Sequence, residues 1–258
     1  MPADDDPSQQ PYPAAVTVDD FSRTLAAVQA RIATAAERAG RHLEDVRLLP
    51  VSKTVDEDRL RNAIAAGCRE LGENKVQEAK RKHDNLSDLN VSWSVIGHLQ
   101  TNKARDVAAF AAEFQALDSL RLAEALDRRL QSAERSLDVF VQVNTSAEES
   151  KYGLAPEEVP NFLRQLPRFP TLRVQGLMTL ALFSSDLDRV RACFGRLRTL
   201  RDRARDEDPD LIGAGGLSMG MSGDFEVAVE EGATCVRVGQ AIFGSRTLGE
   251  QHYWPSGG

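Results

Sequence analysis

The segment VRLLPVSKTVDEDRLRNAIAA (46–66) decides the fold, because a short and almost continuously apolar run leads directly into a helical pattern. Strands that are apolar on both faces are typical of a parallel sheet covered by helices. The same alternation recurs along the chain. Seven further apolar runs predict strands, at 68–71, 91–97, 113–117, 137–144, 172–179, 215–221 and 234–244.

Eight strand-then-helix units predict a single-domain α/β fold, the (β/α)8 TIM barrel. An open doubly wound sheet fits less well, because its glycine-rich turn follows the first strand, whereas GAGGLSMG (213–220) comes late. Before the barrel we expect one extra helix, capped by Asp19 or Asp20 and ending at Gly40. Residues 1–15 are expected to form a disordered leader, residues 16–248 the barrel, and residues 249–258 a flexible tail.

Composition excludes several classes of function. The 258 residues carry 39 Asp and Glu against 32 Lys and Arg, a net charge of −7 that argues against nucleic acid as a partner. No apolar run reaches the roughly 20 residues that a membrane span requires, and MPADDDPSQQPYP (1–13) does not resemble a signal peptide. Three widely spaced cysteines predict neither a disulfide framework nor a metal site, and they favour the cytoplasm.

Lys53 follows the first predicted strand and is expected at the mouth of the barrel, where barrel enzymes carry their chemistry. A partly desolvated lysine amine at such a position can condense with an aldehyde. A solvated loop lysine is the alternative, and position alone favours it.

Two polar residues follow the next two strands. Asn74 either donates a hydrogen bond to a ligand oxygen or caps the following helix. His98 is a candidate general base, ring-stacking partner or hydrogen-bond donor, or else a structural histidine.

The last two strands predict a phosphate site. Ser218 and Ser222 lie at the end of strand seven, and Gly239 is expected along strand eight. Small residues and helix N-termini bring backbone N–H groups close to an anion, and barrels commonly hold phosphate here. An ordinary turn is the alternative. Arg237 lies inside an apolar strand, so a carboxylate or a ligand acceptor is expected to meet its guanidinium.

Together these residues suit a phosphorylated aromatic aldehyde, and pyridoxal 5′-phosphate (PLP) is the obvious candidate. Lys53 would form a Schiff base with it. Ser222 and Gly239 would hold the phosphate, and Arg237 would face the pyridine nitrogen.

Several long motifs then support a family resemblance. From about residue 20 to 246, the chain resembles the YggS/PROSC family of pyridoxal phosphate homeostasis proteins, in PVSKT (50–54), GENKVQE (72–78), WSVIGHLQTNK (93–103), VNTSAEESKYGL (143–154), GLMTL (176–180) and LSMGMSGDFEVAVEEGATCVRVGQAIFG (217–244). The resemblance implies a barrel like the N-terminal domain of alanine racemase, with no established turnover. It implies cofactor contacts at Lys53, Asn74, His98, Ser218, Met219, Ser222, Arg237 and Gly239.

We expect a cytoplasmic PLP carrier rather than an enzyme. Alanine racemases take a second acid/base group, a tyrosine, from an additional domain for which this chain has no room. An arginine facing the ring nitrogen also leaves that nitrogen unprotonated, which weakens the electron sink. The alternatives are a PLP enzyme with weak racemase activity and a Schiff-base aldolase acting on a sugar phosphate. The expected partners are PLP itself and PLP-dependent apo-enzymes, and a monomer is expected.

Overall fold

A computed structural model describes residues 12–148 and 151–245, and its eight parallel strands form one sheet. Each predicted apolar run overlaps one strand, so the predicted barrel is confirmed. The strands are β1 Arg47–Pro50, β2 Glu70–Glu73, β3 Ser92–Val95, β4 Glu113–Leu117, β5 Leu137–Gln142, β6 Leu172–Met178, β7 Gly216–Ser218 and β8 Cys235–Val238.

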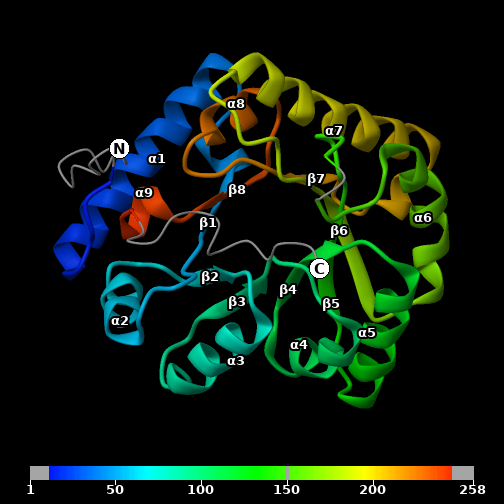
Figure 1. Cartoon of the computed structure of the whole chain (residues 1–258), viewed down its shortest axis with the longest axis horizontal. Coiled ribbons are helices and arrows are strands. Elements are labelled where there is room, and N and C mark those ends of the chain that lie inside the picture. Colours follow the sequence, from blue (N-terminus) through cyan, green and yellow to red (C-terminus); the bar gives the residue numbers. More distant parts are fainter. Residues whose placement is uncertain (1–11, 149–150, 246–258) are drawn as a thin grey trace, which may run out of the picture.

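The sheet closes on itself where β1 lies between β8 and β2. Arg47 of β1 is in register with Cys235 of β8. On the other side Val51 forms a parallel bridge with Gly72, and the Ser52 N–H donates to the Gly72 carbonyl at 3.0 Å. Because every strand is parallel, all carboxyl ends meet at one rim of the barrel (Figure 1).

Helices surround the strands and cover their outer faces (Figure 1). Their apolar sides complete a core in which most of the strand residues are fully buried. Among the described residues, no helix has both the length and the apolarity needed to cross a membrane. The α-helices are α1 Val18–Arg38, α2 Glu57–Ala65, α3 Val76–Asn85, α4 Ala104–Phe110, α5 Leu120–Ser132, α6 Val159–Gln165, α7 Leu187–Glu207, α8 Phe225–Glu230 and α9 Gln240–Phe243. The 3-10 turns are Leu43–Asp45, Thr101–Lys103, Pro156–Glu158, Leu166–Arg168 and Pro209–Leu211.

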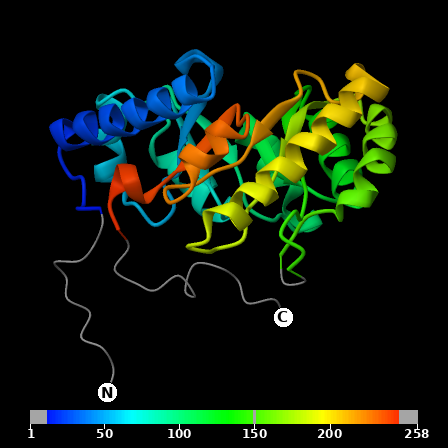
Figure 2. The same cartoon turned by 90° about the horizontal axis from the view of Figure 1, so that it is seen from above.

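The predicted extra helix is α1, which packs against α2, α8 and α9 (Figure 2). Its N-cap is Thr17, not Asp19 or Asp20. The Asp20 N–H donates to the Thr17 hydroxyl, and the Asp20 carboxylate accepts from the Thr17 N–H at 2.9 Å. Hydrogen bonds to the carboxylate from the Thr17 N–H, the Thr17 hydroxyl and the Val16 N–H lower the pKa of Asp20 to about 2. The sequence interpretation missed the reciprocal capping pair, in which the aspartate is the third residue of the helix.

The end of strand eight also differs from the prediction. The strand stops at Val238, and Gly239 is the N-cap of α9 instead of a strand residue. The Ser222 hydroxyl accepts hydrogen bonds from the N–H groups of Gly239 and Ala241, at 3.2 and 3.3 Å. A strand would need ladder partners for these groups, and β7 has already ended at Ser218.

Part of the expected leader belongs to the folded structure. Ala15 is buried, and its carbonyl accepts from the Arg59 guanidinium at 2.6 Å. The Tyr12 carbonyl accepts from the Ser245 N–H at 2.9 Å. Residues 1–11 and the expected tail at 249–258 lie outside the described residues.

Candidate functional site

Lys53 lies just beyond β1, on the rim formed by the carboxyl ends of the strands. Only 9% of the residue is exposed, so the interpretation as a solvated loop lysine is wrong. Asp56 caps the next helix, α2, by accepting from the Arg59 N–H. A primary amine is therefore held inside the protein at the first strand end.

Arg237 lies in β8 and is 3% exposed. Its guanidinium donates to the Ser218 hydroxyl at 2.6 Å and to the Thr179 carbonyl at 2.8 Å. Both acceptors are neutral, and burial lowers the pKa of Arg237 from its usual value. The guanidinium thus meets a hydroxyl and a backbone carbonyl in place of the predicted carboxylate, and the alternative, a ligand acceptor, stays a prediction. Since a guanidinium has five N–H donors, these two bonds leave it able to donate further.

Ser218 connects Arg237 to a polar chain inside the barrel. Its hydroxyl donates to Gln115 Oε1 at 2.7 Å, and Gln115 Nε2 donates to Glu113 Oε1 at 2.6 Å. Glu113 in turn accepts from Arg47 at 2.6 Å. Glu113, the carboxylate of this chain of hydrogen bonds, is separated from Arg237 by Ser218 and Gln115. The structure assigns Ser218 to holding this arginine.

The segment after β7 folds tightly against α8. Gly220 has φ +94, and an added Cβ would lie 2.6 Å from the Ala228 Cβ, so only glycine fits. Asp224 accepts from the Met221 N–H, and burial raises the pKa of this carboxyl. Met219 is fully buried in the core.

Gly239 brings this segment to the strand that precedes Lys53. An added Cβ at Gly239 would lie 3.1 Å from the Val51 carbonyl oxygen. Ser222, which accepts from the Gly239 N–H, is 8% exposed. The predicted lysine and the predicted phosphate residues therefore lie on neighbouring strand ends.

Asn74 and His98 come together after β2 and β3. An added Cβ at Gly97 would lie 2.1 Å from the Asn74 carbonyl oxygen, so the chain before His98 passes directly over Asn74. Lys75, not Asn74, is the N-cap of α3. The interpretation of Asn74 as a helix cap is wrong, and its side chain stays a candidate ligand contact.

His98 has two partners on the rim that the sequence interpretation missed. Its ring stacks on Tyr152, with centroids 3.9 Å apart and an interplanar angle of 9°. Its Nδ1 lies 3.5 Å from the Asp118 carboxylate, whose pKa is raised by burial although His98 opposes the shift. Asp118 directly follows β4, so considering the residue after every strand would have found it.

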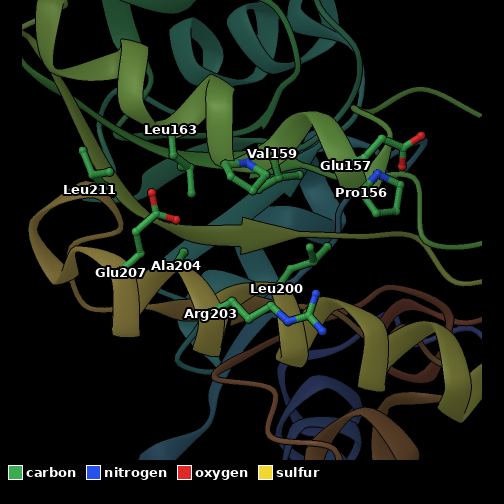
Figure 3. Close-up of a pocket in the computed structure, with 10 residues that line it drawn as sticks. Pro156, Glu157, Val159, Leu163, Leu200, Arg203, Ala204, Glu207 and Leu211 are labelled. Atoms are coloured by element: carbon green, nitrogen blue, oxygen red, sulfur yellow. The ribbon is translucent and has the colours of Figure 1, made fainter.

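A separate cavity of about 320 Å³ lies on the outside of the barrel between α6 and α7 (Figure 3). Val159, Leu163 and Leu200 line it, with Arg203 and Glu207 at its polar edge. None of the predicted site residues lines this cavity. The candidate site is therefore the barrel rim alone.

Comparisons with known proteins show the family of the chain. Residues 24–247 match the model of the alanine racemase N-terminal domain family. The pyridoxal phosphate homeostasis protein of Pseudomonas aeruginosa is 42% identical over 230 residues, which cover 89% of this chain and 97% of that protein. The chain belongs to the pyridoxal phosphate homeostasis protein family. The homologue from Aquifex aeolicus is 40% identical and covers 86% of this chain and 96% of its own.

The structure of PipY from Synechococcus elongatus PCC7942 with PLP bound has the same fold as this member of the pyridoxal phosphate homeostasis protein family. Its TM-score is 0.78 at 34% identity, over 87% of this chain and all of that one. The family resemblance drawn from the motifs is therefore confirmed.

Proposed function

We propose that this protein binds PLP through Lys53 and acts in intracellular PLP homeostasis, without sustained catalysis of its own. The observation that carries the proposal is the buried amine of Lys53 on the same rim as Arg237 and the Ser222 and Gly239 pair. Its relatives at 40% and 42% identity are named pyridoxal phosphate homeostasis proteins, and the related PipY structure has PLP bound.

The residues of the rim fit the three polar parts of PLP. PLP supplies an aldehyde that condenses reversibly with a primary amine, releasing one water, so Lys53 would hold it as a Schiff base. Arg237 has donors left for the ring nitrogen. Backbone close to Gly239, where a side chain would meet the Val51 carbonyl, suits a phosphate. Asn74 and His98 would border the ring from the β2 and β3 side.

Burial explains how the protein would retain the cofactor. Lys53 is 9% exposed, so water has little access to the carbon–nitrogen bond that holds PLP. Arg237 can only donate a hydrogen bond, so a ring nitrogen that faces it would stay unprotonated and would stabilise a substrate carbanion poorly. Holding without turnover follows from these two features.

The test is to locate the bound cofactor chemically. Purified protein is incubated with PLP, reduced with borohydride and digested, and the pyridoxyl group is mapped by mass spectrometry. We expect it on Lys53, and we expect Lys53→Ala to lose the label. Lys75→Ala, which removes an exposed lysine after β2, should label like the wild type. A label on another lysine would overturn the assignment.

A PLP enzyme with weak racemase activity is the second candidate. The pairing of His98 with Asp118, and the stacking of His98 on Tyr152, place acid/base groups on the rim. Deuterium exchange at Cα of L- and D-alanine separates the two functions. A carrier exchanges no more than free PLP, whereas sustained exchange that is lost in His98→Asn would establish the enzyme.

Delivery to apo-enzymes by a monomer completes the proposal. The loaded protein should transfer PLP to an apo-enzyme faster than free PLP reaches it by diffusion. Equal rates would reduce the role to storage, and sedimentation at the concentrations of the assay tests the monomer.

A further inference from the structure

A lysine of α3 is completely buried beside the β1 end of the barrel. Lys82 has no exposed surface, and its ammonium donates to Glu73 at 2.7 Å, to Glu78 at 2.8 Å and to the Ser52 carbonyl at 2.8 Å. An ammonium has three N–H donors, so these three acceptors use all of them. One of the acceptors is the backbone of the residue just before Lys53.

The same cluster holds the chain on both sides of Lys53. The Ser52 hydroxyl donates to Glu73 Oε1 at 2.6 Å, and the Thr54 N–H donates to Glu78 Oε1 at 2.9 Å. Thr54 has φ +69, a left-handed conformation that is costly for a β-branched residue. Such a conformation persists only where the surroundings impose it, and the bond to Glu78 does so here.

We propose that Lys82 is a positioning residue for Lys53: with Glu73 and Glu78 it fixes the backbone that aims the cofactor-binding amine into the barrel mouth. The inference rests on the proposed function, because it concerns the geometry of the lysine that would hold PLP. Lys82 acts through the main chain of Ser52 and Thr54.

The charges of the cluster indicate a role beyond filling space. A buried ion pair is seldom more stabilising than well-packed apolar residues of the same volume. Here two carboxylates share one ammonium. Burial raises the pKa of Glu73 although Lys82 opposes it. At Glu78 burial also acts to raise the pKa, but Lys82, the Thr54 N–H and Arg81 together lower it. The cluster is therefore a costly way to fill the site, and its distinctive feature is the two attachments to the backbone around Lys53.

The test separates covalent capture from simple binding. Pyridoxine 5′-phosphate has an alcohol in place of the aldehyde of PLP, so its affinity reports the ring and phosphate contacts alone. In Lys82→Met we expect covalent capture of PLP to fall about tenfold or more, the scale on which misplaced reacting groups lose function. Affinity for pyridoxine 5′-phosphate should stay within about twofold of wild type, because the contacts to Arg237 and Ser222 are unchanged.

Lys80→Met is the matched control, since it removes an exposed ammonium of the same helix that pairs with Asp84. It should change neither measurement. Equal losses for both vitamers in Lys82→Met, or no loss for either, would overturn the inference.

A second pair of variants decides the question if Lys82→Met does not fold. Glu78→Ala removes the acceptor of the Thr54 N–H from a partly exposed position, whereas Glu78→Gln keeps an oxygen there. Covalent capture should fall in Glu78→Ala and recover in Glu78→Gln, with pyridoxine 5′-phosphate affinity unchanged in both. Capture that is the same in both variants would contradict the proposal. Wild-type protein labelled at a residue other than Lys53 would instead refute the proposed function, so the two failures are distinguishable.

Discussion

The two sides of the barrel mouth are held in place by different kinds of hydrogen-bonding group. On the side of β1 to β3, charged groups set the geometry, since Lys82, Glu73 and Glu78 form a hydrogen-bonded cluster behind Lys53. On the side of β7 and β8, the contacts of Arg237 and Ser222 are hydroxyl groups and backbone.

This difference matches two kinds of task. A reacting amine must be aimed within narrow limits, and strong charge-assisted bonds to its backbone supply that precision. A phosphate site needs donors that are not already neutralised by a carboxylate. The Ser222 hydroxyl bonds to the backbone N–H groups of Gly239 and Ala241, while the Asp224 carboxylate is taken up by the Met221 N–H. The comparison predicts that a substitution on one side of the mouth can impair the function of that side and leave the function of the other side unchanged.

The largest effect is expected where backbone meets backbone on the β2 and β3 side. In Gly97→Ala the new methyl would lie 2.1 Å from the Asn74 carbonyl oxygen, and no side-chain movement relieves that contact. We expect a loss of about 3 kcal/mol in the free energy of unfolding, measured by urea denaturation. Gly223→Ala on the other side is the control, because nothing lies within 4 Å of its added Cβ. A change below about 0.5 kcal/mol is expected there, and equal losses would contradict the steric argument.

The second effect is a pH dependence of the free energy of unfolding, which comes from the cluster of Lys82, Glu73 and Glu78. The folded pKa of Glu73 is raised by burial above its ordinary value of 4.5. Between the two values the folded state binds more protons than the unfolded state, so the free energy of unfolding falls as pH rises. In Glu73→Gln this fall should disappear. Each tenfold difference in proton affinity between the folded and unfolded states corresponds to about 1.4 kcal/mol of unfolding free energy.

Urea denaturation at pH values from below 4.5 to 8 measures the pH dependence that each of the two carboxylates, Glu73 and Glu78, gives to the free energy of unfolding. Glu78→Gln should behave in the opposite way, because burial of Glu78 is outweighed by Lys82, the Thr54 N–H and Arg81, which together lower the pKa of Glu78. The stability contributed by Glu78 is present above about 4.5 and is lost as pH falls through the lowered value. Parallel pH profiles for the two variants would argue against the charge assignment.

The sequence predicted the barrel because hydrophobic periodicity is local. Eight apolar runs, each followed by a helical pattern, contain the information for a parallel closed sheet, and the residues after β1, β2 and β3 are placed on the rim by that topology alone. The positions of three rim residues could be predicted in this way, those of Lys53, Asn74 and His98. The order of the motifs along the chain then gave the family.

The partners of these residues could not be predicted from the sequence, because they come from distant parts of the chain. The stacking of His98 on Tyr152 depends on where two loops meet. The burial of Lys82 depends on how α3 packs against the end of β1, whereas lysines in general are solvent-exposed. The end of β8 was misjudged because Ser222, seventeen residues earlier than Gly239, supplies the cap that starts α9.

The third prediction concerns that cap on the β7 and β8 side. Ser222→Ala leaves the N–H groups of Gly239 and Ala241 without their acceptor, which should cost about 1 kcal/mol of unfolding free energy. Affinity for pyridoxine 5′-phosphate should fall about fivefold, while the wild-type and variant proteins form the covalent bond at Lys53 to the same extent once saturated. Ser92→Ala, an exposed serine at the opposite end of the barrel, is the control. A loss confined to covalent capture would reverse the assignment of the two sides.

The smallest effect is expected from the segment that precedes α1. The Tyr12 hydroxyl donates to the Ser222 carbonyl at 3.1 Å, so residues close to the chain start brace the β7 and β8 side. Tyr12→Phe removes one partly buried hydrogen bond and should cost about 0.5 kcal/mol, with affinity for pyridoxine 5′-phosphate lowered about twofold. Tyr152→Phe, which keeps the ring stacked on His98, is the matched hydroxyl deletion on the other side of the mouth. If Tyr12→Phe weakened covalent capture and left pyridoxine 5′-phosphate affinity intact, the bracing would act on Lys53 and the division of the mouth into two independent sides would be wrong.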